Sequence, residues 1–397
     1  MATFGPLAGV RVLELGNFIA APTAGRLLAE FGADVVKVER PGTGDELRRW
    51  RLHGGDTSLL FRTLARNKRS VTLDLRRPAG RDIALRLVEQ ADVVLENFRP
   101  GTLEKWGLGP DVLHRVNPEL VLVRISGYGQ TGPYRDRPGF GGVAEAVGGL
   151  RALTGYPDQP PVRVGISLAD SVAGLYAVIG ALLGLLRGTG ETVDVALYEA
   201  VHSLMESLVP DFDAFGVVRG PSGAGLPGVA PSNTYRCADG GYVVISGNGD
   251  GIFRRLMAVV GRPDLADDPR LADNAGRVEH VDELDAAIGA WTAEHPMAEV
   301  EAALAAASVP SGPILTVEDI VKDPHYAARG MHERHRVRID GEHTEDVLFP
   351  GVVPKLAAHP GRTTWLGPEL GAHTDEVLAG IGVDDAARAA LRAEGVI

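Results

Sequence analysis

The chain has 397 residues, and its hydrophobic fraction of 45% and charged fraction of 23% are typical of a globular protein rather than a disordered or fibrous one. The net charge of −12 argues against non-specific binding to nucleic acids or to anionic membranes. The single cysteine excludes an intrachain disulfide and favours a reducing, cytoplasmic setting. The N-terminal residues lack a basic flank followed by an apolar core, so we expect no signal peptide.

Strands and helices alternate in the first half of the chain. Residues 10–15 predict a buried strand, 22–31 a helix that ends at Gly32, and 34–38 a second strand. The pattern recurs with strands at 71–75, 92–95 and 120–126 and with helices at 78–90 and 110–116. Alternating strands and helices form parallel sheets. The sequence therefore predicts a doubly wound α/β fold.

A long apolar segment follows at residues 171–186. It is short for a membrane span and is bounded closely by Asp170 and Arg187, so we interpret it as a buried core helix and expect no membrane partner. Within it, Gly180 and Gly184 would let another part of the backbone approach closely. A strand at 192–198 and a helix at 199–208 come next.

The second half of the chain differs from the first in composition and in its predicted elements. Residues 216–232 are rich in Gly and Pro and predict a linker, and 235–322 predict a small α+β unit. That unit has a strand at 241–246 and helices at 252–260, 281–293 and 297–307. The chain closes with strands near 335–339 and 347–350 and helices at 374–381 and 384–394.

Two patterns imitate known binding motifs. Residues 127–132 have the glycine spacing of a dinucleotide-binding turn, but that turn needs a helix to begin at once, and Pro133 and Pro138 bracket the residues that follow. We interpret the segment as a turn-rich loop, which argues against a nicotinamide oxidoreductase. The histidines between 325 and 343 lack the zinc-protease spacing, so we expect solvated side chains and no metal.

Ser167 and Asp170 stand just before the apolar helix. Their spacing alone favours a capping box, in which both side chains bind free backbone N–H groups. The alternative is catalytic, because the dipole of a helix keeps a carboxylate on its first turn ionised. An ionised carboxylate can act as a nucleophile toward an activated acyl group.

Basic and amide side chains gather near three strand ends. Arg40 follows the second strand, residues 66–69 precede the third, and residues 97–99 follow the fourth. We expect the three groups to meet at one edge of the sheet and form a phosphate pocket in which Phe98 stacks on a base. The alternative for any one residue is an ordinary surface loop.

Loop 246–251 is polar and glycine-rich, which favours a tight turn between a strand and a helix over a mobile cover for an active site.

Taken together, these segments resemble the family III CoA-transferases, which include formyl-CoA transferase, carnitine CoA-transferases and the α-methylacyl-CoA racemases. The matching stretches are 9–45, 66–76, 96–109, 126–140 and 194–200, with further matches in the second half. The resemblance implies a large Rossmann-like domain with a parallel sheet built from both chain ends, at 1–225 and 331–397. It also implies a small α+β domain inserted with its linkers at 226–330, and an interlaced homodimer.

The resemblance further implies a chemistry centred on Asp170. This aspartate would attack the thioester of an acyl-CoA and pass CoA to a carboxylic acid acceptor through aspartyl anhydride and aspartyl-CoA thioester intermediates. Coenzyme A thioester is then a substrate, and no permanently bound cofactor or metal is expected. Backbone N–H groups, from loop 246–251 among others, would stabilise the tetrahedral oxyanion.

The family's CoA-binding positions carry over to a set of polar and aromatic residues in this chain: Asn17, Arg40, Asn67, Lys68, Arg69, Asn97, Phe98, Arg99, Lys105 and Arg137. The loop that shields the intermediate in some members matches Gly247, Gly249 and Gly251, although this chain has fewer consecutive glycines there. Candidates to line the acyl pocket are Trp50, Phe61, Tyr128 and Phe140, for which ordinary core packing is an equal explanation.

Two other functions stay open. An α-methylacyl-CoA racemase or related acyl-CoA isomerase needs an acid paired with a histidine shortly after the segment at 127–130, where this chain has Gly139–Gly142 and no histidine. A non-catalytic CoA-binding protein would bind CoA without any use of Asp170. The acyl group and the acceptor acid cannot be read from these residues.

Overall fold

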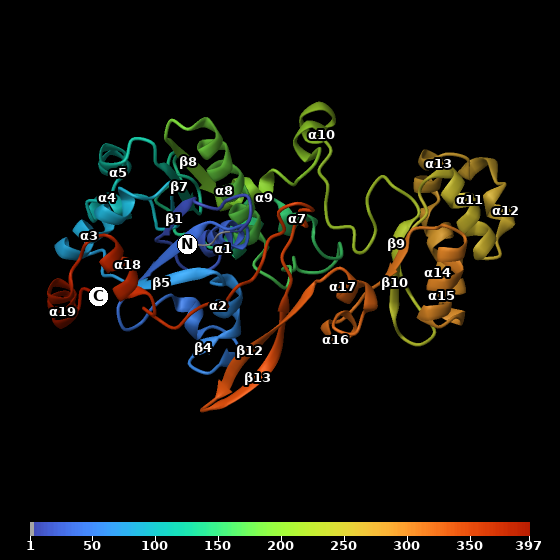
Figure 1. The fold of residues 1–397 in the computed structure, drawn as a ribbon. Coiled ribbons are helices and arrows are strands. Elements are labelled where there is room, and N and C mark those ends of the chain that lie inside the picture. The colour runs from blue at the N-terminus through green and yellow to red at the C-terminus, as the bar shows by residue number, and fades with distance from the viewer. Residues whose placement is uncertain (1–3) are drawn as a thin grey trace. The chain divides into compact units, whose positions relative to one another are not determined.

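The computed structural model describes residues 4–397, which form two compact units (Figure 1). The first unit contains the chain up to Leu150 together with Val164–Val209 and Ala327–Ile397. The second unit contains Arg151–Arg163 and Pro210–Tyr326. Each has a hydrophobic core of its own. Both ends of the chain therefore contribute to the first unit, and the second is formed by residues between them.

A six-stranded parallel sheet forms the centre of the first unit, in the order β5-β2-β1-β6-β7-β8. The strands are β1 (Arg11–Glu14), β2 (Asp34–Glu39), β5 (Lys68–Thr72), β6 (Val93–Glu96), β7 (Val121–Ser126) and β8 (Glu191–Ala196). The predicted α/β fold is confirmed. Because the strand order reverses between β1 and β6, the connections that follow these two strands lead in opposite directions along the sheet and leave a crevice where such sheets bind ligands.

The central sheet is not built from both chain ends, and that prediction is wrong. All six strands come from residues 11–196. The C-terminal strands β12 (His332–Asp340) and β13 (His343–Pro350) pair with each other instead, in a separate antiparallel hairpin. Within this hairpin each strand pairs the backbone N–H and C=O groups that face its partner strand, and the groups on its outer edge are left outside the ladder. The same segment then adds helices α18 (Thr374–Gly380) and α19 (Asp385–Ala393).

The remaining elements of the first unit follow the predicted order. Helices α1 (Ala20–Glu30), α3 (Pro78–Val88) and α5 (Pro110–Val116) lie within two residues of their predicted bounds. The helix predicted at 199–208 is shorter, as α9 (Leu197–His202), and α10 (Leu208–Phe215) follows it. Shorter elements are η1 (Glu46–Arg49), β3 (His53–Gly54), β4 (Thr57–Ser58), α2 (Leu59–Leu64), α4 (Thr102–Lys105) and α6 (Gly141–Val147). Helix α7 (Leu150–Leu153) begins at the last residue of this part of the first unit and continues into the second.

Helix α8 (Leu168–Arg187) is only half buried, so its interpretation as a buried core helix is wrong for one face. Its alanines and glycines pack inward, and a Cβ on Gly180 or Gly184 would lie 2.5 or 2.7 Å from a valine of the sheet, as the predicted close approach requires. The opposite face exposes 40–85% of five apolar residues: Leu175, Ile179, Leu182, Leu183 and Leu186. By length and composition α8 could cross a membrane, yet here it packs on α1, α9, β7 and β8.

Strand β5 begins and ends three residues earlier than the predicted strand at 71–75. Its first half contains Lys68 and Ser70, which are both buried in polar contacts, so the apolar pattern that marks a strand is missing there. Leu73 and Leu75 lie beyond the end of the strand but belong to the core beside the sheet. The shift matters because it moves the residues after β5 to the carboxyl edge of the sheet.

The second unit is a small α+β fold. Its antiparallel sheet has the order β11-β10-β9, with β9 (Ser232–Arg236), β10 (Tyr242–Ser246) and β11 (Ser311–Pro313). The core contains Val243 and Ile245 of the sheet with Phe253, Leu256 and Leu284 of the helices. The helices are α11 (Asp250–Val259), α12 (Pro263–Ala266), η2 (Pro269–Leu271), α13 (Asn274–Glu279), α14 (Val281–Glu294), α15 (Met297–Ala306), α16 (Val317–Ile320) and α17 (Pro324–Ala328).

His373 attaches the C-terminal segment to the edge strand β5. Ser70 N–H donates to His373 Nδ1 at 3.2 Å, and His373 N–H donates to the Ser70 carbonyl. Burial lowers the pKa of His373 below its ordinary 6.5, so folding favours the neutral ring. The stability that this neutral ring contributes is present above pH 6.5 and is lost as the pH falls below it.

We expect His373→Ala to reduce the free energy of unfolding by about 1 kcal/mol near neutral pH and by less in acid, measured by denaturant titration. Equal losses at both pH values would contradict this.

Candidate active site

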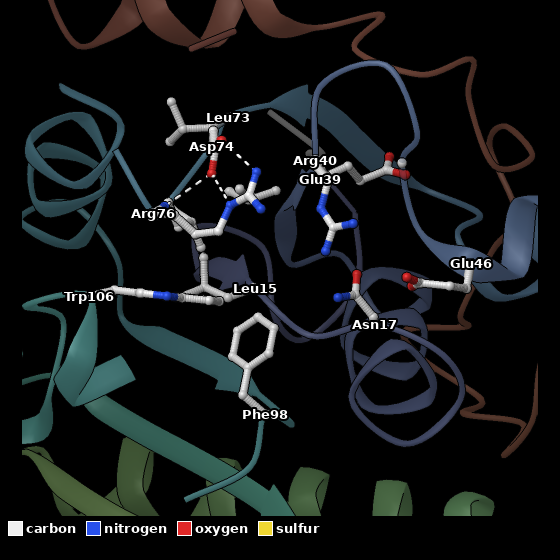
Figure 2. A pocket seen from close by; sticks show the side chains of 13 residues that line it. Leu15, Asn17, Glu39, Arg40, Glu46, Leu73, Asp74, Arg76, Phe98 and Trp106 are labelled. Carbon is white, nitrogen blue, oxygen red and sulfur yellow. Dashed lines mark hydrogen bonds and ion pairs between the residues drawn. The ribbon is translucent and has the colours of Figure 1, made fainter. Parts of the chain in front are cut away.

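A pocket opens at the carboxyl edge of the central sheet, beside the point where the strand order reverses (Figure 2). Asn17 comes from the loop after β1, Arg40 follows β2, and Phe98 follows β6. In Figure 2 the Arg40 guanidinium extends toward the Asn17 amide, and the Phe98 ring lies on the other side of the opening. The structure thus brings together three of the predicted CoA-binding residues.

The pocket also has a charged wall that the sequence did not reveal. Arg76 donates to Asp74 at 2.8 and 2.7 Å, and this bond lowers the pKa of the Asp74 carboxyl. Opposite, the Phe98 and Trp106 rings meet edge to face, with centroids 5.0 Å apart. Two exposed guanidiniums and an aromatic surface are what a nucleotide with several phosphates requires.

Asn97 acts on the backbone of the loop that carries Asn17. Asn97 Oδ1 accepts from Asn17 N–H at 2.8 Å, and its Nδ2 donates to the Asn17 carbonyl at 2.7 Å. The oxygen and the nitrogen of this side-chain amide are therefore both bonded to the backbone of one residue. The predicted CoA-binding position 97 supports the pocket through Asn17.

The group at residues 67–69 does not meet Arg40, and the prediction that all three groups share one sheet edge is wrong here. These residues begin β5, and Lys68 is level with Val35 near the start of β2, at the amino end of the sheet. The Lys68 ammonium is fully buried against Glu14 at 2.6 Å. Asn67 bonds to the Ala29 and Arg362 carbonyls, and Arg69 pairs with Asp34.

The other predicted cations lie on exposed loops and turns of the first unit. Arg99 is in the turn that leads into α4, and Lys105 is the last residue of that helix. The Arg137 guanidinium stacks on the Tyr134 ring, 3.6 Å from its centroid, in the loop after β7. This loop continues without a helix until Gly141, as predicted for the false dinucleotide motif at 127–132.

Asp170 lies half-buried on the first turn of the twenty-residue helix α8. Its carboxylate is packed against Gly141, the first residue of α6: a Cβ built on that glycine would lie 2.0 Å from Asp170 Oδ2. The capping-box interpretation is wrong, because the Ser167 side chain makes no hydrogen bond to the helix end. The helix dipole favours the ionised form of a carboxylate at this place.

Aromatic side chains connect the pocket to Asp170. Phe18 follows Asn17, and its ring lies 5.4 Å from Trp50 and 6.0 Å from Phe140, centroid to centroid. Phe140 in turn precedes Gly141. Of the candidate acyl-pocket residues, Phe140 therefore links Phe18 to the glycine that packs on the carboxylate, and Trp50 packs on the same Phe18 ring.

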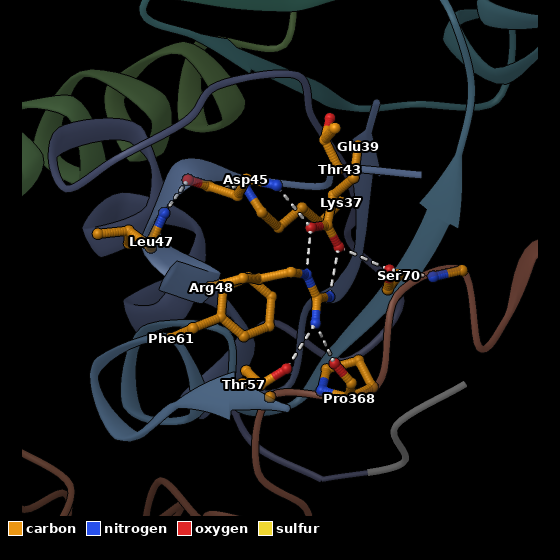
Figure 3. Close-up of polar contacts among 12 residues, drawn as sticks. Lys37, Glu39, Thr43, Asp45, Leu47, Arg48, Thr57, Phe61, Ser70 and Pro368 are labelled. Atoms are coloured by element: carbon orange, nitrogen blue, oxygen red, sulfur yellow. Dashed lines mark hydrogen bonds and ion pairs between the residues drawn. The ribbon is translucent and has the colours of Figure 1, made fainter. Parts of the chain in front are cut away.

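The other two acyl-pocket candidates lie elsewhere in the first unit. Phe61 is buried beneath the Arg48 guanidinium, 3.8 Å from its ring centroid (Figure 3). Tyr128 packs with Tyr134 and Tyr198. For these two, core and surface packing is the better explanation.

In the second unit, loop 246–251 is a tight turn between β10 and α11, as the spacing predicts. Its shape is fixed by Arg277, whose buried guanidinium donates to the Asn248 carbonyl and to Asp250, both at 2.8 Å. Gly247 has no room for a side chain, because a Cβ would lie 2.4 Å from Leu256. The shielding role of Gly247, Gly249 and Gly251 stays a prediction. Within residues 4–397 no group of three or more His, Cys, Asp or Glu side chains is arranged so that it could hold a metal ion.

The chain matches a known protein family along most of its length. The sequence profile of CoA-transferase family III matches residues 7–374. The chain is 48% identical to the succinyl-CoA–D-citramalate CoA-transferase of Chloroflexus aurantiacus, over 99% of this chain and 98% of that one. It is 44% identical to the succinyl-CoA–L-malate CoA-transferase beta subunit of the same organism, over 99% and 98%.

A solved structure has the same fold. The crystal structure of a CaiB/BaiF family protein from Brucella suis is 34% identical and superimposes with a TM-score of 0.83, over 96% of this chain and all of that one. The family profile covers most of the sequence, and the relatives match it from end to end. The chain belongs to CoA-transferase family III.

Proposed function

We propose that this CoA-transferase moves CoA from succinyl-CoA to a dicarboxylic acid through a covalent intermediate on Asp170. The observation that carries the proposal is the position of the Asp170 carboxylate, half-buried on the first turn of α8 and packed against Gly141. The dipole of α8 favours the charged form of a carboxylate on its first turn, and an ionised carboxylate can act as a nucleophile toward an acyl group.

The CoA moiety would bind in the pocket at the carboxyl edge of the sheet. Arg40 and Arg76 are the groups there that suit the phosphates, and Phe98 and Trp106 offer an aromatic surface to the adenine. Asn17 and Phe18 lead from this pocket toward Phe140 and Gly141, so the pantetheine arm would follow them to the carboxylate. Arg99, Lys105 and Arg137 remain candidates for further phosphate contacts.

The reaction would proceed in four displacements. The Asp170 carboxylate attacks the thioester carbonyl and displaces CoA thiolate, which gives a mixed anhydride of the aspartate and the acyl group. The thiolate then attacks the aspartyl carbonyl and releases succinate, which gives an aspartyl-CoA thioester. The acceptor carboxylate repeats the two displacements in reverse order, so that the acceptor leaves as a CoA thioester and the aspartate is regenerated. The energy of the thioester is conserved throughout, and the atoms balance without an oxidant or a metal.

The choice of substrates rests on the relatives. Two proteins at 44% and 48% identity are named for succinyl-CoA as donor and for malate or citramalate as acceptor. A protein at 35% identity is named for formyl-CoA and oxalate. The greater similarity of the first two favours succinyl-CoA and a hydroxy dicarboxylic acid for this chain.

We also propose that the enzyme is an interlaced homodimer. The exposed face of α8 presents five large apolar residues in a row along one helix, which a monomeric protein rarely leaves in water. The predicted small domain at 226–330 and the cytoplasmic setting remain part of the same proposal.

The test is a matrix of donors and acceptors. Succinyl-CoA, acetyl-CoA and formyl-CoA are incubated with D-citramalate, L-malate, glutarate or oxalate, and the new CoA ester is followed by chromatography. We expect succinyl-CoA with a hydroxy dicarboxylate to react at least about tenfold faster than formyl-CoA with oxalate. Transfer with none of these pairs would reject the proposal. Deuterium uptake at the α-carbon without an acceptor would favour the isomerase alternative instead.

A further inference from the structure

The loop from Gly16 to Phe18 joins the CoA pocket to the active carboxylate. It leaves β1 where the strand order reverses and enters α1 two residues later. Asn17 lines the pocket, and the Phe18 ring contacts Trp50 and Phe140. Phe18 has a φ of +63°, in the left-handed region that side chains other than glycine seldom adopt. Something must hold this backbone in place.

Side chains from three directions hold it. The Gly16 carbonyl accepts from Lys37 Nζ at 2.8 Å, and both the N–H and the carbonyl of Asn17 bond to Asn97. Phe18 N–H donates to Asp45 Oδ1 at 3.1 Å. Four consecutive polar groups of the backbone are thus bound by side chains, and the Asn17 and Phe18 side chains are left to face the substrate.

Two of these side chains belong to a buried group of charges. Lys37 Nζ lies 2.8 Å from Asp45 Oδ2 and 2.9 Å from Glu14 Oε1, and all three side chains are at most 2% exposed. Asp45 Oδ1 also accepts from Leu47 N–H, as Figure 3 shows. Helix α1 passes directly over the group, since a Cβ on Gly25 would lie 1.9 Å from Glu14 Oε2. Burial alone would lower the pKa of Lys37, but the surrounding carboxylates outweigh it and raise that pKa, so the ammonium stays charged.

A buried charge cluster is weak evidence for stability, because removing ions from water costs as much as their attraction returns. Its use must be sought in what it positions. We propose that Lys37, Asp45 and Asn97 are positioning residues for catalysis, which orient Asn17 toward CoA and Phe18 toward the reacting carboxylate without touching the substrate. This inference rests on the proposed function, because it assumes that CoA occupies the pocket beside Arg40.

The test compares two equally buried cations. Lys37→Met removes the ammonium that binds the Gly16 carbonyl, whereas Arg66→Met removes a guanidinium that is just as buried and pairs with Glu30 instead. Both variants are expected to lose stability. Only Lys37→Met is expected to weaken the binding of free CoA, measured by calorimetry, by about tenfold or more, and Arg66→Met should stay within about twofold. Equal affinities for CoA in the two variants would overturn the inference.

Asn97→Ala keeps the inference testable should Lys37→Met fail to fold, because Asn97 is outside the buried charges. It is measured alone and together with Asn17→Ala. If Asn97 acts through Asn17, its effect on the dissociation constant of CoA largely disappears when Asn17 is already alanine. A full effect in both backgrounds would mean that Asn97 binds CoA directly, and would overturn the positioning role.

The two proposals can fail separately. Affinity for free CoA needs no transfer, so an enzyme that binds CoA but transfers it to no acid would refute the chemistry at Asp170 and still test the positioning. A wild-type enzyme that does not bind CoA would refute the site itself and the inference with it.

Discussion

Asp170→Ala is expected to reduce CoA transfer by about 10⁴-fold or more, because the proposed covalent intermediate, which divides the reaction into easier steps, forms on this carboxylate. The variant should bind free CoA as the wild type does, since the pocket beside Arg40 does not include this side chain. The measurements are the turnover number by chromatography and the dissociation constant of CoA by calorimetry. In the wild type, hydroxylamine added with succinyl-CoA should give a hydroxamate on the peptide that contains Asp170.

A matched control is available in α5. Asp111 also lies on the first turn of a helix, and it is exposed at the surface. Asp111→Ala removes a carboxylate from the same kind of helix position and should leave turnover within about twofold. Turnover in Asp170→Ala above about a hundredth of the wild-type value would reject the covalent route through Asp170, and hydroxamate formation at another residue would assign the intermediate to that residue instead.

The fold could be predicted where each segment carries its own signal. Strands β1, β2 and β7 each contain a short run of buried apolar residues beside buried charged ones, and α3 and α5 begin with proline, so the local patterns mark these elements. β5 was misplaced because Lys68 and Ser70 are buried in polar contacts that no local pattern reveals. Only the neighbouring strand and helix explain how a lysine can lie inside the sheet.

Helix α8 shows a second feature that the sequence pattern does not predict, which is the partner that covers each face of an apolar helix. Its sequence is apolar on every side, which predicts burial but does not say what buries it. In the chain itself the alanine and glycine face packs on the sheet, and the leucine face is left exposed. A hydropathy pattern cannot separate the two faces, because their side chains differ in size rather than in polarity.

The sequence predicted only those residues of the CoA pocket that follow correctly predicted strand ends. Arg40 and Phe98 follow strands whose ends were correctly placed, so the rule for parallel sheets brought them to the right edge. Arg76 and Trp106 were missed, and a correct end for β5 would have directed attention to Arg76. The contact between Gly141 and Asp170 joins residues far apart in the sequence, and no local sequence pattern predicts it.

Gly141→Ala is expected to lower the turnover number by about 100-fold while the enzyme still folds and binds CoA. The new methyl group would lie 2.0 Å from Asp170 Oδ2 and 2.8 Å from its Cγ, so the carboxylate must move. A displacement of about 1 Å from the attacking position costs on the order of 100-fold in rate. Because Asp170 is only half-buried, it has room to turn outward, and the loss of stability should stay near the lower end of the usual 1–3 kcal/mol for an overpacked site, roughly 1 kcal/mol.

Gly165→Ala is the matched control, since this glycine precedes α8 in the same segment and a Cβ there would meet nothing within 4 Å. Its turnover number should stay within about twofold of the wild type. Gly141 is buried at the start of α6, whereas Gly165 is exposed in the loop before α8. A fall confined to position 141, in a variant that still folds and binds CoA, would support the carboxylate beside it as the reacting group. If Gly141→Ala transferred CoA at the wild-type rate, the carboxylate could be displaced without consequence, and Asp170 could not be the nucleophile.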